Sequence, residues 1–224
     1  MQKKLDAYRG KLSPSNLAKG MTAAACNARR LADDAATLLA AGSFPTAASL
    51  ATLAIEEAGK ASILRALALA KSDAEIKDEW KAYRSHTNKN VAWLLPTLAA
   101  SGARKLDDLR PLFDEKSDHP FVLDQLKQLG FYTDCLGSGH WAIPTEVIDE
   151  NLARMLVNVA DVLARDKEVS EQEIQLWIEH VGPVWKKEPA WMKTALANWY
   201  AAMQAAGLAP EGENKMEQFI RHGV

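Results

Sequence analysis

Two short stretches of the sequence bring together side chains that suit proton transfer. Glu56, Glu57 and Lys60 lie in the middle of TAASLATLAIEEAGKASILRAL, residues 46–67, where almost every other position is small or apolar. His86 follows in WKAYRSHTNKN. Histidine can take up and release a proton near neutral pH, because its unperturbed pKa is about 6.5. General acid–base chemistry is therefore the reaction class that these residues suit best.

The neighbours of His86 supply charge and hydrogen-bonding groups to such a site. Arg84 and Lys89 could stabilise a phosphate or a developing negative charge, and Glu57 could orient or tune the imidazole. The predicted catalytic residues are Arg84, His86, Lys89 and Glu57. The predicted supporting polar shell consists of Glu56, Lys60 and Asn90.

Helical spacing places part of this charge on a face that is otherwise apolar. Steps of three and four residues across 50–67 keep one helical face together, and Glu57 and Lys60 interrupt its leucines. Glu56 lies just beside that face. Two interpretations stay open: a structural Glu57–Lys60 pair at i,i+3 spacing, or a functional polar cluster that meets a partner on a facing helix.

The facing helix is expected within residues 80–98, where apolar side chains gather on one side. His86, Lys89 and Asn90 gather on a different side. We therefore expect His86 to line a groove, a secondary contact or a subunit interface, and not the main apolar contact of that helix.

Capping residues and helix breakers predict the elements that carry these residues. The expected helices cover about 14–41, 45–70, a short segment after Ser72, 85–100, 120–129, 145–165, 170–180 and 189–206. Pro96 predicts a kink, and residues 102–119 are expected to form a charged linker. The segment FYTDCLGSGHWAIP predicts a turn or a short hairpin. The predicted fold class is all-α.

Composition and spacing exclude several classes of function. A formal net charge of −2 and a pI near 6.2 give no large basic field, so binding of duplex DNA is not expected. Neither a signal peptide nor a membrane span is expected, which predicts a soluble cytoplasmic protein without a membrane partner. Cys26 and Cys135 lack CxxC spacing and are expected to be buried thiols.

The sequence also lacks the ligand spacings of familiar metal sites. No histidine has a glutamate three positions before it, as a di-metal carboxylate bundle would need, and no zinc-ligand spacing is present. We therefore expect neither a metal nor another cofactor.

Longer motifs resemble a known family. AGSFPTAASLATLAIEEAGK followed by WKAYRSHTNKN resembles the AbiV-type abortive-infection proteins, which belong to the HEPN-like all-helical domains of bacterial phage defence. LKQLGFYTDCLGSGHWAIPTEVI is similar to the same family, and the resemblance covers about residues 20–165. It implies a HEPN-like helical bundle over 1–168 and a homodimer. Residues 169–224, which the resemblance does not cover, are expected to form a C-terminal helical extension packed on that bundle.

The resemblance also implies an activity. Many HEPN domains are metal-independent endoribonucleases, in which an Arg-x4–6-His motif at a dimer interface promotes attack of a ribose 2′-hydroxyl on the adjacent phosphate. This chain departs from the motif, because Arg84 stands two positions before His86. Lys81 stands five positions before His86, but an ammonium lacks the planar fork of a guanidinium.

Two functions follow as expectations. One is antiphage defence by a ribonuclease toxin whose partner is RNA. The alternative is a non-enzymatic module that binds a phage or host protein. The tryptophans of the last third are a candidate contact surface for that module, although burial is their expected state: Trp177, Trp185, Trp191 and Trp199.

Overall fold

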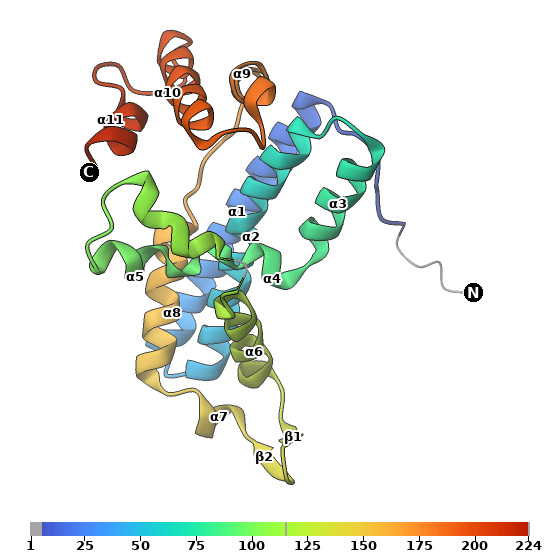
Figure 1. Cartoon of the computed structure of the whole chain (residues 1–224). Coiled ribbons are helices and arrows are strands. Elements are labelled where there is room, and N and C mark those ends of the chain that lie inside the picture. Colours follow the sequence, from blue (N-terminus) through green and yellow to red (C-terminus); the bar gives the residue numbers. More distant parts are fainter. Residues whose placement is uncertain (1–5, 115, 224) are drawn as a thin grey trace.

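Two long antiparallel helices form the centre of the molecule (Figure 1). The computed structural model describes residues 6–114 and 116–223, apart from the side chain of Phe113. Ser13 caps α1 (Pro14–Ala40), because its Oγ accepts a hydrogen bond from the backbone amide of Asn16. Gly42 has a φ of 76° and lets the chain reverse into α2 (Phe44–Leu69).

The other elements surround this pair. They are α3 (Asp73–Arg84), α4 (His86–Lys89), η1 (Val91–Leu94), α5 (Leu95–Ala100), η2 (Leu106–Phe113), α6 (His119–Phe131), β1 (Asp134–Leu136), β2 (His140–Ala142), α7 (Pro144–Val147), α8 (Glu150–Leu163), α9 (Glu171–Val181), η3 (Gly182–Val184), α10 (Pro189–Ala205) and α11 (Lys215–Arg221). α8 packs on α1 and α2, and α6 packs on α2. The all-α fold class is therefore confirmed, with one antiparallel hairpin, β1–β2, in the described part of the chain.

Small side chains let the central helices approach closely. Alanines from both helices lie in the largest buried group, among them Ala28, Ala35, Ala47, Ala51 and Ala54. Larger side chains from α6 and α8, such as Leu123 and Leu156, fill the remaining space of this group. Each fully buried large aliphatic side chain contributes about 1.5–3 kcal/mol relative to an exposed one.

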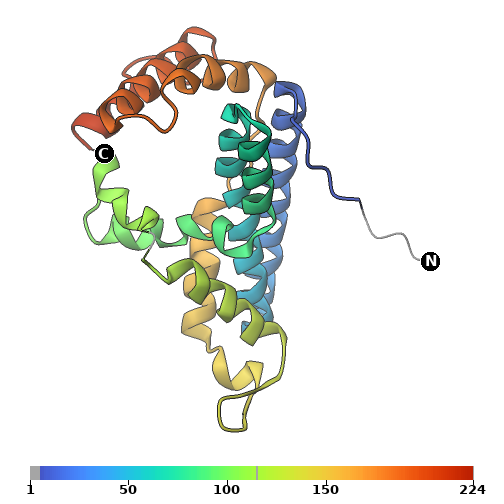
Figure 2. The ribbon, with the colours of Figure 1, turned by 45° about the vertical axis from the view of Figure 1, so that its right-hand side comes forward.

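The C-terminal helices lie at the end of the α1–α2 pair that is opposite to the hairpin (Figures 1 and 2). α9 contacts both central helices, and α10 contacts α9. The rings of Trp177 and Trp199 pack edge to face with centroids 5.2 Å apart, and both residues are buried. Trp185 is partly buried and Trp191 is exposed. Burial is thus confirmed for the two tryptophans that join α9 to α10.

Two expected helices are wrong in their extent. The segment 85–100 is divided: α4 ends at Lys89, and the 3₁₀ turn η1 separates it from α5. Pro96, which has no amide proton for a helical hydrogen bond, lies in the first turn of α5. The segment 145–165 is divided because α7 ends at Val147 and Asp149 caps α8. The expected linker at 102–119 also contains the 3₁₀ helix η2.

The expected burial of the two thiols is wrong as well. Cys26 and Cys135 are both exposed. Cys26 lies on α1, where its Sγ is 3.5 Å from Oδ1 of Asp166, and Cys135 lies in the exposed strand β1.

Candidate functional site

A buried carboxylate, that of Glu56, is the centre of a polar cluster between α2, α4 and α6. Its side chain is 3% exposed. Its Oε1 lies 2.7 Å from Nζ of Lys127, and its Oε2 lies 2.7 Å from Nδ1 of His86. Nζ of Lys89 lies 3.2 Å from Oε2, and Nζ of Lys127 also lies 2.7 Å from Oδ1 of Asp124. We call Glu56, His86, Lys89, Asp124 and Lys127 the Glu56 cluster.

Two glycines allow the three helices to meet at this cluster. A Cβ on Gly59 of α2 would lie 2.0 Å from the carbonyl oxygen of Lys89, so only glycine admits α4 at its present distance. A Cβ on Gly130 of α6 would lie 2.3 Å from Oγ of Ser49 on α2. That hydroxyl donates a hydrogen bond to the carbonyl oxygen of Lys127, which ties α6 to α2 beside the cluster.

The central carboxylate and ammonium hold each other in the charged state. Burial alone would raise the pKa of Glu56, but hydrogen bonds from Lys127 and His86 and the nearby positive charges outweigh burial and lower it. Burial alone would lower the pKa of Lys127, but hydrogen bonds to Asp124 and Glu56 outweigh burial and raise it. Both groups are therefore ionised at neutral pH.

His86 presents Nδ1 to the cluster, and its side chain is partly open to solvent. The ionised carboxylate of Glu56 can only accept a hydrogen bond, so we assign the proton to Nδ1. The side chain is 54% exposed. In the neutral ring, Nε2 then carries a lone pair and can accept a proton from a bound molecule. This is the geometry of a general base that a carboxylate orients.

The structure brings only part of the predicted site together. His86, Lys89 and Glu56 meet, whereas the carboxylate of Glu57 lies 2.5 Å from Nζ of Lys60 on the same helix. The residue that orients the imidazole is thus Glu56 and not Glu57. One position along a helix rotates a side chain by about 100°, which separates the buried carboxylate from its half-buried neighbour.

Two other predicted residues lie next to the cluster without joining it. Arg84 donates to the backbone carbonyls of Trp80 and Tyr8, and its guanidinium lies 5.0 Å from the centroid of the Trp80 ring. Asn90 is fully buried, and its Nδ2 donates to the carbonyl oxygen of Pro120 at 3.2 Å. Asn90 therefore helps to hold α6 beside α4.

Sequence reasoning did not single out Asp124 and Lys127. Both lie on α6 at i,i+3 spacing, the spacing that drew attention to Glu57 and Lys60 on α2. The same signal was therefore present in the apolar segment HPFVLDQLKQLGF. What the sequence lacks is the pairing of α6 with α2 across 71 positions of the chain.

The cluster also contains three groups of a kind that bind metals. Ligand atoms of Glu56, His86 and Asp124 lie within 4.8 Å of one another. The ammonium of Lys127 lies 2.7 Å from each of the two carboxylates, and its raised pKa keeps it charged. A cation would have to displace this buried charge, so these residues fit an ammonium better than a metal ion.

Among the described helices, none has the combination of length and apolar character that crossing a lipid bilayer takes.

Of the comparisons with known proteins, the one with family models gave a match. The family model HEPN_AbiV, described as AbiV, matches residues 16–165, a span that contains the whole Glu56 cluster and ends before α9. Neither the curated proteins nor the solved structures gave a match. The matched span covers more than half of the chain. The chain therefore belongs to the HEPN_AbiV family, and this membership suggests a role in abortive-infection defence against phage.

Proposed function

We propose that this protein is a metal-independent endoribonuclease of abortive infection, with His86 as its proton-transfer residue. The observation that supports this proposal is the imidazole held at 2.7 Å by the buried carboxylate of Glu56 while more than half of it is exposed. Because Nδ1 meets Glu56 and the side chain is more than half exposed, Nε2 is the ring nitrogen left for a bound molecule, and Nδ1–H keeps the ring in the tautomer of a base.

The proposed reaction needs no atom beyond RNA and this chain. Nε2 of His86 takes the proton of a ribose 2′-hydroxyl, and the 2′-oxygen forms a bond to the adjacent phosphorus. The bond from phosphorus to the 5′-oxygen breaks, and that oxygen takes back a proton from the imidazolium. The products are a 2′,3′-cyclic phosphate and a 5′-hydroxyl. Glu56 would stabilise the imidazolium that forms between the two transfers.

The cations near His86 take different parts in this proposal. Nζ of Lys89 faces Glu56 and its side chain is buried, so Lys89 supports the carboxylate and does not reach RNA. Arg84 and Lys81 are exposed on α3, the helix that precedes α4. They are the candidates for contact with the RNA phosphates.

Replacing His86 with alanine should lower the rate of RNA cleavage by about 10²–10⁴-fold, the usual contribution of a general acid–base residue. Cleavage of single-stranded RNA by the purified full chain in the presence of EDTA measures this effect. The products should carry cyclic phosphate ends. His140→Ala is the matched control, because His140 is exposed in β2 and outside the Glu56 cluster.

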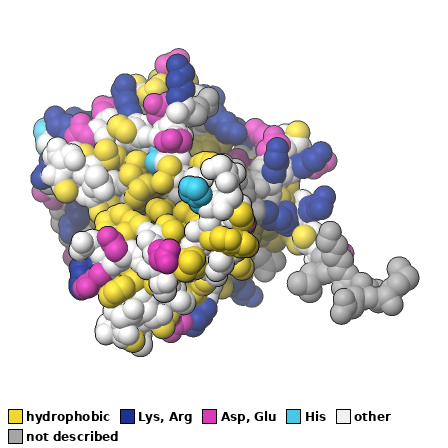
Figure 3. Space-filling model, turned by 90° about the horizontal axis from the view of Figure 1, so that it is seen from below, with side chains coloured by type: hydrophobic (Ala, Val, Ile, Leu, Met, Phe, Trp, Pro, Cys, Tyr) yellow, Lys and Arg dark blue, Asp and Glu magenta, His cyan; other side chains and the backbone are white. Residues whose placement is uncertain are grey.

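The result that contradicts the ribonuclease proposal is equally clear. A wild-type protein that cuts no RNA, or a His86→Ala variant as active as the wild type, would remove it. The binding-module alternative would then gain support from the exposed apolar side chains of the hairpin and its flanks. Figure 3 views the molecule from the end where the hairpin lies and shows hydrophobic side chains gathered there. We call the exposed apolar side chains of the hairpin and its flanks the hairpin surface: Tyr132, Leu136, Trp141, Ile143 and Val147.

A homodimer is the remaining part of the proposal, and the hairpin surface is the contact that we would test. Large exposed apolar patches are typical of protein–protein contacts. Sedimentation velocity should give a particle of about twice the 24.6 kDa chain mass, and Trp141→Ser should shift it toward the monomer. Trp191→Ser changes an exposed tryptophan elsewhere and should leave the mass unchanged. A monomeric wild type would contradict the dimer.

A further inference from the structure

A groove with a volume of about 620 Å³ lies where the segment that precedes α1 runs beside α3 (Figure 1). Two side chains of α3 tie that segment to the helix. Nε1 of Trp80 donates to the carbonyl oxygen of Gly10 at 2.9 Å, and Arg84 donates to the carbonyl oxygen of Tyr8. Arg9 stands between these two acceptors in the chain, so the same contacts hold it at the groove that it lines.

Positive charge gathers in this groove. Of its described lining residues, four are cations and one is an acid: Arg9, Lys77, Lys81, Arg84 and Asp78. The whole chain has a formal net charge of −2, so this concentration does not follow from a basic composition. None of the ion pairs in the described part of the chain includes any of the four cations. Their charge is therefore available to an anionic ligand.

Stabilisation of α3 itself explains only part of this charge. Lys81 and Arg84 lie in the last turn of α3, where cations interact favourably with the helix dipole. Lys77 lies earlier in the helix and Arg9 lies outside it, so neither has that role. Glu75 does not balance them, because its carboxylate accepts from two backbone amides at the start of α3.

The spacing of the cations fits the backbone of a nucleic acid strand. Lys77, Lys81 and Arg84 follow one another at i, i+4 and i+7, which places them along one face of α3 over about 10 Å. The phosphates of a helically stacked strand follow at about 3.4 Å, so two or three of them can lie along this face. The ring of Trp80 is buried and offers little surface on which a base could stack.

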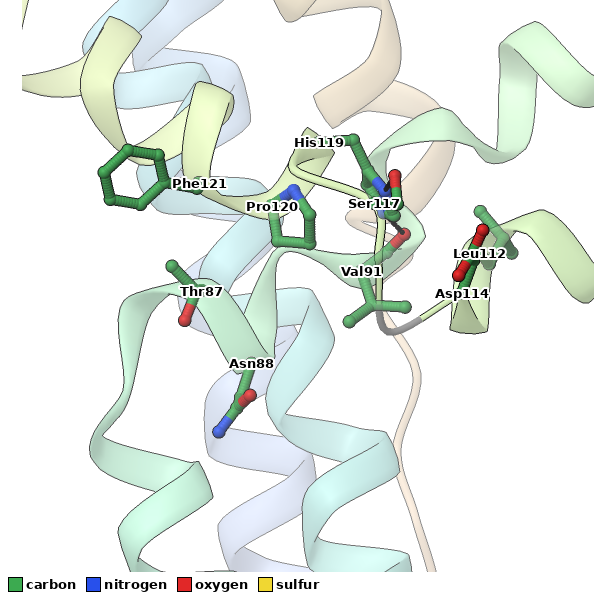
Figure 4. A pocket seen from close by; sticks show the side chains of 9 residues that line it. All are labelled: Thr87, Asn88, Val91, Leu112, Asp114, Ser117, His119, Pro120 and Phe121. Atoms are coloured by element: carbon green, nitrogen blue, oxygen red, sulfur yellow. Dashed lines mark hydrogen bonds between the residues drawn. The ribbon is translucent and has the colours of Figure 1, made fainter.

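A second pocket near α4 has a different character. Its volume is about 550 Å³, and Thr87, Asn88 and Val91 contribute to its lining (Figure 4). In the described part of the chain its lining includes neither Lys nor Arg. Of these two pockets, the groove at α3 is therefore the one that suits a phosphate.

We propose that the groove at α3 binds the sugar–phosphate backbone of single-stranded RNA without reading its bases. This inference rests on the proposed ribonuclease function for the identity of the strand. Contacts with phosphates position a nucleic acid, whereas contacts with base edges specify its sequence. Ser85 also lines the groove, so a bound strand lies at the start of α4.

Fluorescence anisotropy tests the groove with the full chain and a labelled oligouridylate that carries 2′-O-methyl groups, which prevent cleavage. Neutralising two or three phosphates gives a salt dependence that weakens binding by about 7- to 20-fold between about 50 and about 200 mM salt. An oligocytidylate of the same length should bind with the same affinity within about twofold, because phosphate contacts carry no sequence information. Binding that is independent of salt, or that depends on the base, would overturn the inference.

The double variant Arg9→Gln/Lys77→Gln identifies the groove. It should bind the oligouridylate roughly tenfold more weakly and reduce the slope of log affinity against log salt by about 1 or more. The matched control is Lys19→Gln/Lys215→Gln, which removes the same charge from exposed positions of α1 and α11 that do not line the groove. This control should bind like the wild type. Equal weakening by the two double variants would overturn the inference.

Competition shows which source of negative charge the groove accepts. Inorganic phosphate, at the same total concentration of phosphate groups, should displace the oligouridylate less well than unlabelled oligouridylate does, because a strand makes several contacts at once. Poly-glutamate at the same total charge should also compete less well. Equal competition by phosphate would leave a site for a free anion, and equal competition by poly-glutamate would leave a site for an acidic protein segment. Either result would overturn the placement of RNA.

The groove and the ribonuclease can fail separately. RNA binding that Arg9→Gln/Lys77→Gln weakens as expected, in a wild type that cuts no RNA, would refute the ribonuclease alone. RNA cleavage by a wild type whose RNA binding this variant leaves unchanged would refute the groove alone.

Discussion

Replacing Glu56 with glutamine should lower the free energy of unfolding by about 3–5 kcal/mol, the usual cost of breaking a buried ion pair from one side. The side chains of Lys127 and Lys89 are only 5% and 8% exposed, and both ammonium groups face this carboxylate. A glutamine amide offers one neutral acceptor, so the two cations would stay buried with one negative charge fewer. Urea denaturation at pH 7 measures the change.

The adjacent residue provides the control. Glu57→Gln removes the same charge one position further along α2, but its partner is Lys60 on the same helix and both side chains are only partly buried. Pairs of this kind contribute a few tenths of a kcal/mol, up to about 1. Equal losses in the two variants would show that the buried cluster does not support the fold.

Lowering the pH should show how much the same carboxylate contributes to the stability of the wild type. Folding lowers the pKa of Glu56 from its ordinary 4.5, so its contribution is complete above that value and is lost as pH falls through the lowered pKa. Folding raises the pKa of Lys127 from its ordinary 10.5, so that contribution persists below 10.5 and is lost above it. The loss of stability below pH 4.5 should be smaller for Glu56→Gln than for the wild type.

Replacing Gly59 with alanine should cost both stability and RNA cleavage. The added Cβ would lie 2.0 Å from the carbonyl oxygen of Lys89 and 2.9 Å from its carbonyl carbon. These are backbone atoms that no side-chain rotation can move away, so α4 would have to shift and take His86 with it. We expect a loss of about 3 kcal/mol, the upper end for overpacking, and about 100-fold slower cleavage from a displacement near 1 Å.

Gly20→Ala controls for the general effect of alanine in a helix. On α1 the new Cβ would lie 3.6 Å from Cδ1 of Leu64, an ordinary contact. Alanine favours a helix over glycine by about 1 kcal/mol, so this variant should be as stable as the wild type or more so. If Gly59→Ala behaved like Gly20→Ala in denaturation and in cleavage, α4 would not depend on the close approach.

Local signals in the sequence were sufficient for the long helices and insufficient for the site. Ser13 and Ser170 cap their helices as their positions predict, because a cap depends on residues within one turn. The position of α4 against α2 depends on its close approach to Gly59, which no local pattern records. Whether Glu56 or Glu57 belongs to the buried cluster depends on the position of Lys127, which lies on a helix that is distant in the sequence.

Because α4 is a single turn, it depends on contacts with other elements to stay folded. A helix of four residues has too few internal hydrogen bonds to persist in water, so attraction to one carboxylate and the fit against one glycine keep it folded. The group proposed to position the imidazole therefore also holds the backbone that bears that imidazole. Removing the Glu56 carboxylate would therefore not leave a folded but inactive protein, because the same contacts hold α4 in place and position the imidazole.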